Sequence, residues 1–561
     1  MIELKKKPFC LNDAAIEWIE QVKYKMSLDE KIGQLFVPIG YSGDHKYLDD
    51  VMLRHHIGGI MYRQGRAEDV QNTFRYLQCH SPVPLLIGAN LEMGGNGIAT
   101  DGTIFGRQMQ IAATGNTEQA YRLGKVSCAE AKAVGCNWSF APVVDIDLNY
   151  HNPITNVRTY GQDPNQVLQY ALAYKRGADE EGFAVAIKHF PGDGVDEVDQ
   201  HILVSVNSLT CEEWDATYGK VYQGLIDDGA MTCMVGHIAQ PAYQEAIDGK
   251  KEQALIPATL SPALLSGLLR KKLGFNGLII TDSTCMVGFN VLMPRSQSVP
   301  YAIEAGCDMF LFNKDLEEDF QYMKGGYLTG ILSEKRLDEA LTRILATKAA
   351  LGLHKLSSQQ RVPAPQALEV IGCKEFRTWA KECAEQSVTL VKDTQRALPL
   401  SPSKTPKILL EVLGNFESSK RVEITYKSLL EDAGFQVIVY QKEVFGTADF
   451  KVETFRSRYD LVLYVGNMET GSNQVTNRYQ WFTFHGNGDN CPWFTAERPV
   501  VYVSHGNPYA LLDAPQIKTF INAYTNHDDV IQATVGKLVG KSAFKGISPI
   551  DPFCGKRYLS Y

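Results

Sequence analysis

Eight short apolar runs recur between residues 27 and 355, and stretches with helical periodicity separate most of them. The runs cover residues 35–37, 59–62, 85–88, 137–140, 184–187, 231–235, 277–281 and 309–312. Two of the intervening helical patterns cover residues 117–134 and 164–180. Eight strands separated by helices are the pattern of a (β/α)8 TIM-type barrel, so the sequence predicts an α/β chain with an N-terminal barrel.

The barrel pattern closes with residues 333–351, where Ser333 is placed to cap a helix and Glu334 favours its first turn. Polar residues and two prolines without periodicity follow. We therefore predict a barrel domain over residues 1–355, a linker over 356–380 and a second domain over 381–561. Six further apolar runs predict a second α/β domain with a mostly parallel sheet, and they cover residues 387–391, 408–412, 437–440, 460–465, 499–503 and 519–522.

Composition narrows the class of protein. An apolar fraction of 44% and a charged fraction of 21% are typical of a soluble globular protein, and no run reaches the roughly 18 apolar residues of a membrane span. A net charge of −8 without a long basic run disfavours nucleic acid as a partner. The 12 cysteines form no Cys-x-x-Cys pair, and the N-terminus lacks the apolar core of a signal peptide. We expect reduced thiols, no metal site, no cofactor and a cytoplasmic location.

The densest group of titratable residues follows the fifth apolar run. The sequence KHFPGDG begins at Lys188 and His189, and Asp199 and His201 come shortly after it. Residues at the C-terminal ends of barrel strands face the active site, so this loop is a candidate site. Asp199 can bond one ring nitrogen of His201 and leave the other for a substrate. The alternative is that both are ordinary exposed loop residues.

A carboxylate, Asp282, ends the seventh apolar run. At that position it either faces a substrate or caps the following helix, and the residues around it leave both open. A carboxylate opposite a proton donor is what glycoside cleavage with a covalent intermediate requires. A histidine can serve as that donor because its ordinary pKa lies near 6.5. Asp282 and His201 therefore form a candidate catalytic pair.

These motifs resemble glycoside hydrolase family 3, in its two-domain β-N-acetylglucosaminidase branch. The loop 188–201 is similar to that branch's Lys-His-Phe-Pro-Gly-His-Gly and Asp-Ser-His signature. The similarity extends along nearly the whole chain, to EKIGQLF (30–36), IGGI (57–60), FAPVVDI (140–146), RTYGQDP (158–164), AIEAGCDM (302–309), AEQSVTLVKD (384–393) and SPIDPFCG (548–555). The resemblance implies that the second domain is an αβα sandwich.

The resemblance also implies a role for individual residues. Asp282 matches the catalytic nucleophile, His201 the acid/base and Asp199 its partner. The positions that match sugar-binding residues of the family, or lie near its site, are Lys188, His189, Arg158 and His237. For His237 a packed structural role is equally compatible with the sequence.

The chain departs from the family pattern at three places. Gln200 replaces a serine, and we expect it to point away from the dyad without effect on it. Asp193 stands where the family has a second histidine, so the loop is rich in carboxylates, some of whose pKa values we expect to be raised; one of them could compete with His201 as proton donor. Asn90 stands where the family has an aspartate that grips the sugar, and Met93 is an added residue. Either the sugar is held differently or Glu92 takes over that contact.

The main hypothesis is a retaining exo-β-N-acetylglucosaminidase that acts on small β-linked N-acetylglucosaminides such as cell-wall fragments. One alternative is a family 3 β-glucosidase or β-xylosidase whose acid/base is Glu469 or Glu497 from the second domain. Another is a phosphorylase, because a neutral histidine does not repel phosphate as a glutamate would. The last is a non-catalytic sugar-binding protein on the same fold. The sequence does not indicate an oligomeric state.

Overall fold

The computed structural model describes residues 2–414, 417–441, 451–481, 483–484, 487–488 and 490–561. The chain divides into two compact units. The first comprises the residues up to Phe105 with Ala120–Asn152 and Gln162–Arg377, and the second comprises Gly106–Gln119, Pro153–Gly161 and Thr378–Tyr561. Two short segments within the barrel sequence therefore belong to the second unit, which the spacing of the apolar runs did not indicate.

Parallel strands form the centre of the first unit, at the eight places predicted. They are β1 (Phe36–Val37), β3 (Gly59–Tyr62), β4 (Leu86–Ala89), β5 (Trp138–Ser139), β6 (Ala184–Phe190), β8 (Thr232–Val235), β10 (Leu278–Thr281) and β11 (Phe310–Leu311). Six of them, with β2 (Ile39–Gly40), make one sheet in the order β10-β8-β6-β5-β4-β3-β2. The strand β11 pairs with β1 and meets β10 through a bridge between Ile280 and Met309, so the ring of strands continues past the ends of that sheet. The predicted barrel is confirmed.

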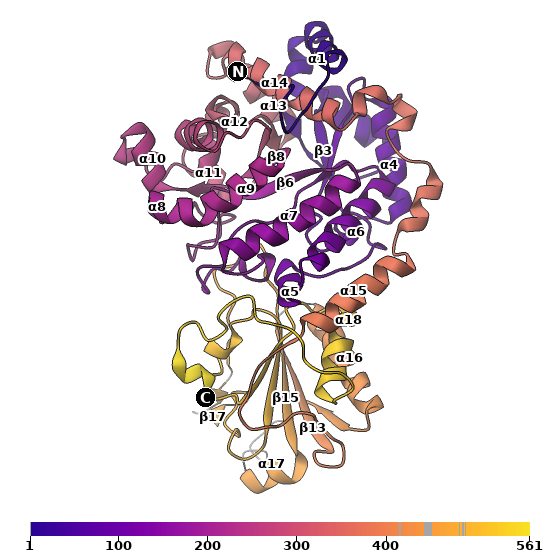
Figure 1. Cartoon of the computed structure of the whole chain (residues 1–561), viewed down its shortest axis with the longest axis vertical. Helices are drawn as coiled ribbons and strands as arrows, with labels where there is room; N and C mark the ends of the chain where they lie inside the picture. The colour runs from indigo at the N-terminus through magenta and orange to yellow at the C-terminus, as the bar shows by residue number, and fades with distance from the viewer. Residues whose placement is uncertain (1, 415–416, 442–450, 482, 485–486, 489) are drawn as a thin grey trace. The chain divides into compact units, whose positions relative to one another are not determined.

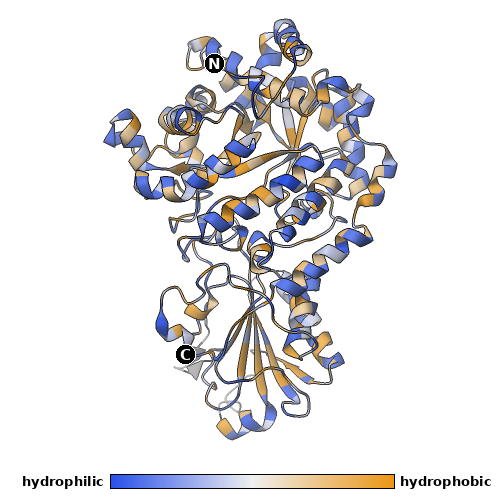
Figure 2. Cartoon of the chain, viewed as in Figure 1, coloured by the Kyte–Doolittle hydropathy of each residue, from blue (hydrophilic) through white to orange (hydrophobic). Residues whose placement is uncertain are grey.

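Helices surround these strands, as Figure 1 shows. The longer ones are α1 (Asp13–Lys25), α4 (Ala67–His80), α6 (Glu118–Val134), α7 (Pro164–Glu180), α9 (Lys220–Asp228), α12 (Arg295–Ala305), α13 (Leu316–Thr329) and α14 (Glu334–Ala350). Ser333 caps α14 as expected, its side chain accepting the N–H of Arg336. Figure 2 shows strands that are mainly hydrophobic and helices of mixed character, which is how an interior sheet differs from an amphipathic outer helix.

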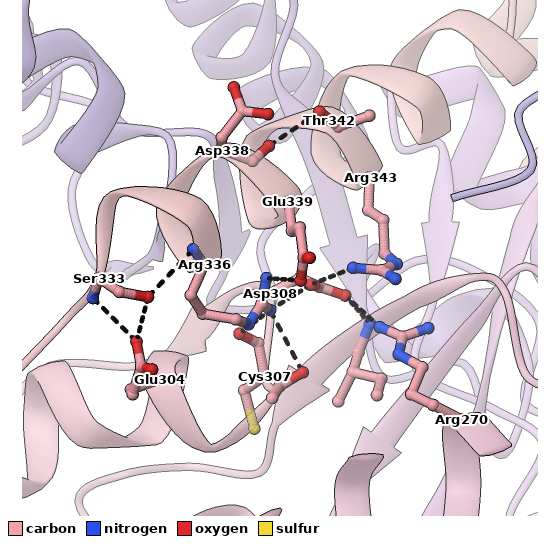
Figure 3. A network of polar contacts seen from close by, with 12 residues as sticks. Arg270, Glu304, Cys307, Asp308, Ser333, Arg336, Asp338, Glu339, Thr342 and Arg343 are labelled. Atoms are coloured by element: carbon pink, nitrogen blue, oxygen red, sulfur yellow. Dashed lines mark hydrogen bonds and ion pairs between the residues drawn. The ribbon is translucent and has the colours of Figure 1, made fainter. Parts of the chain in front are cut away.

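A buried ion cluster ties the last strand to the last helix of the barrel (Figure 3). Asp308, two residues before β11, is fully buried and pairs with Arg270, Arg336 and Arg343. Burial raises the pKa of Asp308, but the three guanidinium groups outweigh it and hold that pKa below its usual range. Burial and the two neighbouring arginines lower the pKa of Arg270 to about 9. The carboxylate is therefore the common counter-ion of three cations.

The second unit is built on a six-stranded sheet in the order β12-β19-β18-β15-β13-β14, with only β12 antiparallel. Its strands are β12 (Thr389–Asp393), β13 (Lys407–Leu413), β14 (Gln436–Val439), β15 (Leu461–Met468), β18 (Val500–Gly506) and β19 (Thr519–Asn522). The helices that follow the barrel sequence are α15 (Lys374–Ser387), α16 (Ser418–Asp432), α17 (Val452–Arg458) and α18 (Asp528–Leu538), and α5 (Gln108–Ala113) lies in the segment Gly106–Gln119 of the same unit. Figure 1 shows α16 and α18 together on one side of this sheet.

Both faces of that sheet are packed. Alternate residues of β13 enter different cores: Ile408 and Leu410 pack with residues of α16 and α18, whereas Leu409 packs with Phe455 of α17. Because successive side chains of a strand point to opposite faces, a sheet covered on both sides needs continuous apolar runs. This explains why the second unit showed such runs in the sequence.

None of the helices in the described ranges is both long and apolar enough to cross a membrane.

Candidate active site

The strand β6 delivers Lys188 and His189, and its pairing is irregular at that point. The register between β6 and β8 shifts between Ile187 and Phe190, so the two residues lie in a break of the ladder. Such an irregularity changes the direction of side chains that would otherwise alternate between the two faces of a sheet. Both side chains are buried, and both reach carboxylates that follow other strands of the sheet.

Lys188 pairs with Glu92. The distance between Lys188 Nζ and Glu92 Oε1 is 2.8 Å, and both residues are largely buried. Glu92 follows the strand β4, so the ion pair joins the carboxyl ends of two strands. Asn90, two residues earlier, is exposed. Glu92, the residue that the sequence suggested as taking over from the family's aspartate, is thus in contact with Lys188.

His189 lies between two carboxylates. Its Nδ1 is 2.7 Å from Asp145 Oδ2, and its Nε2 is 3.9 Å from Asp282 Oδ2. Asp145 also accepts the backbone N–H groups of His189 and Asp193. Burial raises the pKa of Asp145, but the charge of His189 and these hydrogen bonds bring it below its usual range. Asp145 thus fixes the orientation of the imidazole through Nδ1, the ring nitrogen that does not face Asp282.

Asp282 directly follows β10 and is buried. Its backbone N–H continues the ladder to β8 by donating to Val235, and Oδ1 accepts the N–H of Ser283. Burial raises its pKa, but the charges of His189, His237 and His201 outweigh that effect, so the pKa lies below its ordinary value. The side chain is an ionised carboxylate at neutral pH.

His201 and Asp199 form a bonded pair. The distance between His201 Nδ1 and Asp199 Oδ1 is 2.6 Å, and the same oxygen accepts the backbone N–H of His201 at 2.9 Å. The carboxylate of Asp199 is fully buried, whereas 23% of the imidazole is exposed. Nε2 is therefore the nitrogen turned away from the carboxylate. The short loop from Asp199 to His201 is therefore bent so that the two side chains can form this hydrogen bond.

The pKa of the loop residue Asp193 is raised, but mainly by burial and by a carboxylate outside the loop. The residue is buried; burial and the neighbouring charge of Asp145 raise its pKa to about 8, so the carboxyl group is mainly protonated at neutral pH. Its Oδ1 accepts N–H groups from Asn152 and Gly194. The side-chain Nε2 of Gln200 donates to Asp193 Oδ2, and its Oε1 accepts the backbone N–H of His237. Gln200 therefore links Asp193 to the barrel.

His237 is completely buried, and both of its ring nitrogens meet protein groups. Nδ1 lies 3.0 Å from the hydroxyl of Thr259, and Nε2 lies 2.9 Å from the carbonyl of Ser283. Burial lowers its pKa, the charge of Asp282 opposing this in part. His237 thus holds the backbone immediately after Asp282.

Three residues considered in the sequence belong to the second unit. Arg158 ends the turn η4 (Asn156–Arg158) within Pro153–Gly161. Glu469 follows β15, and its carboxylate accepts hydrogen bonds from Ser418 and Asn526. Glu497 is the third such position in that unit, at the end of the segment before β18. The barrel residues described above form a cluster without them.

Within the barrel the structure pairs Lys188 with Glu92 and places the adjacent residue His189 beside Asp282. His201 is near enough for its charge to act on Asp282. Sequence reasoning missed Asp145. The available signal was its place at the end of the apolar run in FAPVVDI, the same strand-end position that singled out Asp282.

Comparison with known families and proteins gave consistent matches. The family model described as "Glycosyl hydrolase family 3 N terminal domain" matches residues 27–347. A β-N-acetylglucosaminidase/β-glucosidase of Cellulomonas fimi is 43% identical and the alignment covers 99% of both chains. A β-hexosaminidase A of Pseudoalteromonas piscicida is 27% identical over 63% of this chain and 62% of its own.

Solved structures give the same fold. A structure of the β-glucoside phosphorylase BglX has a TM-score of 0.93 and 42% sequence identity, covering 99% of both chains. A glycoside hydrolase family 3 β-N-acetylglucosaminidase from a Paenibacillus species has a TM-score of 0.78 and 24% identity, covering 94% of this chain and 99% of its own, and supports the fold alone.

Proposed function

The chain belongs to glycosyl hydrolase family 3, and from that membership we propose that it is a retaining exo-acting β-glycosidase that releases terminal β-linked N-acetylglucosamine. In the first step Asp282 attacks the anomeric carbon while His201 protonates the leaving oxygen. In the second step an acceptor displaces Asp282 and the configuration is retained. The arrangement that carries the proposal is an ionised strand-end carboxylate, Asp282, within the electrostatic reach of the His201–Asp199 pair.

Asp282 suits the role of nucleophile because it stays ionised without a direct cationic bond. A carboxylate locked in a short ion pair would lose nucleophilicity, whereas His189 Nε2 stands 3.9 Å away. The surrounding imidazoles favour the ionised form through space. We assign His237 a positioning role, because its bonds to Thr259 and Ser283 occupy both ring nitrogens.

His201 suits the role of acid and base. The negative charge of Asp199 stabilises the imidazolium before proton transfer, and the bond to Nδ1 fixes the tautomer that presents Nε2. After the leaving group departs, the neutral imidazole accepts a proton from the attacking water. The same nitrogen therefore serves both steps.

Sugar hydroxyls bind where charged groups can both donate and accept. Lys188 donates and Glu92 accepts, and the two side chains are already held 2.8 Å apart. His189 supplies a further ring nitrogen beside Asp282. We propose that Asn90 and Arg158 contribute additional contacts to the glycone, Arg158 through its fork of donors.

A second candidate reaction is phosphorolysis of the same glycosyl–enzyme. Phosphate would attack the anomeric carbon, break its bond to Asp282 and leave as a sugar 1-phosphate with retained configuration. Two observations support it: the proton donor carries no negative charge to repel phosphate, and a structure 42% identical to this chain is named a β-glucoside phosphorylase. That name also supports glucose as a second glycone.

The test is a panel of 4-nitrophenyl β-glycosides carrying N-acetylglucosamine, glucose or xylose, each assayed with and without inorganic phosphate. We expect turnover of the N-acetylglucosaminide above the xyloside, with free sugar in buffer alone. Sugar 1-phosphate formed with phosphate would identify the enzyme as a phosphorylase. Absence of turnover on every glycoside would overturn the proposal.

A pair of variants separates the two candidate proton donors. His201→Ala should lower kcat/KM on substrates with poor leaving groups by about 10²–10⁴-fold, because general acid catalysis is lost. Glu469→Ala removes a carboxylate that bonds only groups of its own unit in the contacts described, and should change kcat/KM less than fivefold. The reverse result would transfer the acid/base role to Glu469. Glu497→Ala completes the comparison.

The cytoplasmic location and the link to cell-wall fragments stay predictions.

A further inference from the structure

Four large aliphatic side chains beside the catalytic loop are exposed to solvent. The exposed fractions are 50% for Leu203, 46% for Val287, 53% for Val291 and 46% for Leu292. A single exposed leucine or valine is ordinary on a protein surface. Four within two short segments, next to a titratable dyad, are a local apolar surface of the kind that marks a binding site.

Backbone contacts join these segments to the dyad. The N–H of Val287, at the start of α11 (Val287–Asn290), donates to the carbonyl of His201 at 3.0 Å. The N–H of Leu203 donates to the carbonyl of Asp199 at 3.2 Å. Gly288 makes the close approach possible, since a Cβ there would lie 2.8 Å from the carbonyl of Leu203.

The two valines lie one helical turn apart. The N–H of Val291 donates to the carbonyl of Val287 at 3.1 Å, so their side chains share one face, and Leu292 follows directly. This set, Leu203, Val287, Val291 and Leu292, is called the aliphatic patch below.

The orientation of the His201–Asp199 dyad indicates which part of the substrate lies over the aliphatic patch. Nδ1 of His201 is bound to Asp199, so the leaving oxygen must approach Nε2. The group attached to that oxygen, the aglycone, is then adjacent to His201 and therefore to the loop and the helix that carry the aliphatic patch. The groups that we propose for the glycone are charged or polar instead: His189 lies beside Asp282, and the next residue back along β6, Lys188, pairs with Glu92.

This difference in polarity points to the chemistry of the aglycone. A second sugar laid on the aliphatic patch would lose water from its hydroxyl groups without gaining partners there, which costs free energy. An alkyl or aryl group would instead remove aliphatic surface from water, which is favourable in proportion to the area buried. We infer that the aliphatic patch is the aglycone site and that the preferred substrates are β-glycosides of alkyl or aryl alcohols, in place of the cell-wall fragments expected from the sequence. The inference rests on the proposed function.

The experiment uses the full chain and a series of primary alkyl β-N-acetylglucosaminides from ethyl to octyl, below micelle-forming concentrations. The leaving alcohols along this series have nearly equal acidity, so changes in kcat/KM report contacts of the chain rather than leaving-group chemistry. We expect kcat/KM to rise about twofold or more per methylene, with complete burial setting a limit of about fourfold.

The variant Leu203→Ser/Val291→Ser should reduce kcat/KM on the octyl glycoside at least about tenfold more than on the ethyl glycoside. Leu328→Ser is the matched control, because Leu328 is also an exposed leucine, 68% exposed, and belongs to a different helix, α13. It should leave the whole series unchanged.

The outcomes separate the two hypotheses. If no glycoside is cleaved, the proposed function and the inference both fail. If ethyl and octyl glycosides are cleaved equally well, or the double variant affects them equally, the inference alone fails. Sedimentation of wild type and double variant adds one more outcome: a dimer that dissociates on the double substitution would show that a second copy covers the aliphatic patch, and would overturn the inference.

Discussion

Replacing Asp193 by asparagine should make the stability of the barrel less dependent on pH. Asp193 has a pKa of about 8 in the folded protein, against an ordinary value of 3.8. Because the folded state holds the proton more tightly, the stabilising contribution is complete below pH 4 and is lost progressively as the pH rises through about 8. Asparagine keeps an uncharged carbonyl at this place and has no proton to lose.

The magnitude follows from the size of the shift. One pKa unit corresponds to about 1.4 kcal/mol, so the wild type loses about 4 kcal/mol between pH 5 and pH 9 through this group. The variant keeps the two bonds that Oδ1 accepts from Asn152 and Gly194, and loses only the long contact of 3.4 Å with Gln200. That contact is at the limit of hydrogen-bond length and its loss costs less than about 1 kcal/mol.

The assay is urea denaturation followed by tryptophan fluorescence at pH 5 and pH 9. We expect Asp193→Asn to be close to wild type at pH 5 and more stable than wild type at pH 9, by up to about 4 kcal/mol. Asp196→Asn is the matched control, a carboxylate in the same loop that is only partly buried and caps backbone N–H groups. A difference between Asp193→Asn and wild type that is the same at both pH values would refute the reasoning.

The Asp193→Asn variant also tests whether Asp193 donates the catalytic proton. Its kcat/KM at pH 6 should stay within about tenfold of wild type, and a loss above about 10³-fold would move the role from His201 to Asp193. Asp199→Asn should lower kcat/KM by about tenfold to a hundredfold, because the bonds to Oδ1 can persist while the charge that stabilises the imidazolium is lost; unchanged kinetics would contradict the dyad. Asp145→Asn places an amide N–H₂ against an N–H of His189 or Asp193 and should lower kcat/KM by about 10- to 100-fold; the measurement is steady-state kinetics with circular dichroism to confirm folding. Asp308→Asn removes the shared counter-ion of three buried guanidinium groups, of which Arg336 keeps a 3.8 Å contact with Glu339, and should cost about 3–5 kcal/mol in urea denaturation without altering KM; a neutral effect would argue against the ion cluster as a stabilising element.

The barrel was predictable because its strands are buried on both sides. A strand such as β6, with every residue buried, must be a continuous apolar run, and such runs are visible without any tertiary information. The ends of the strands were equally visible, since Lys188 and Asp282 break those runs abruptly with a charge. The start of α14 at Ser333 followed from local capping chemistry alone.

The division of the chain into two units was harder to predict from the sequence. Residues Gly106–Gln119 and Pro153–Gly161 belong with the second unit, although they lie between barrel strands in the sequence. Their own composition carries no mark of this, because the partner that buries a segment is chosen by the fold. Arg158 therefore moved from the barrel to the second unit.

The sequence by itself determined the strands, the helix caps and the chemical groups at the strand ends, since these depend on periodicity and on residues close in the chain. The tertiary structure decided which of those groups act on one another. Only the folded barrel pairs Glu92 with Lys188 and Asp145 with His189, across 96 and 44 positions of the sequence. The protonation of Asp193 is a tertiary property as well, because burial and the charge of Asp145 cause it. Electrostatic interactions depend on distance through space and on exclusion of water, neither of which a linear pattern specifies.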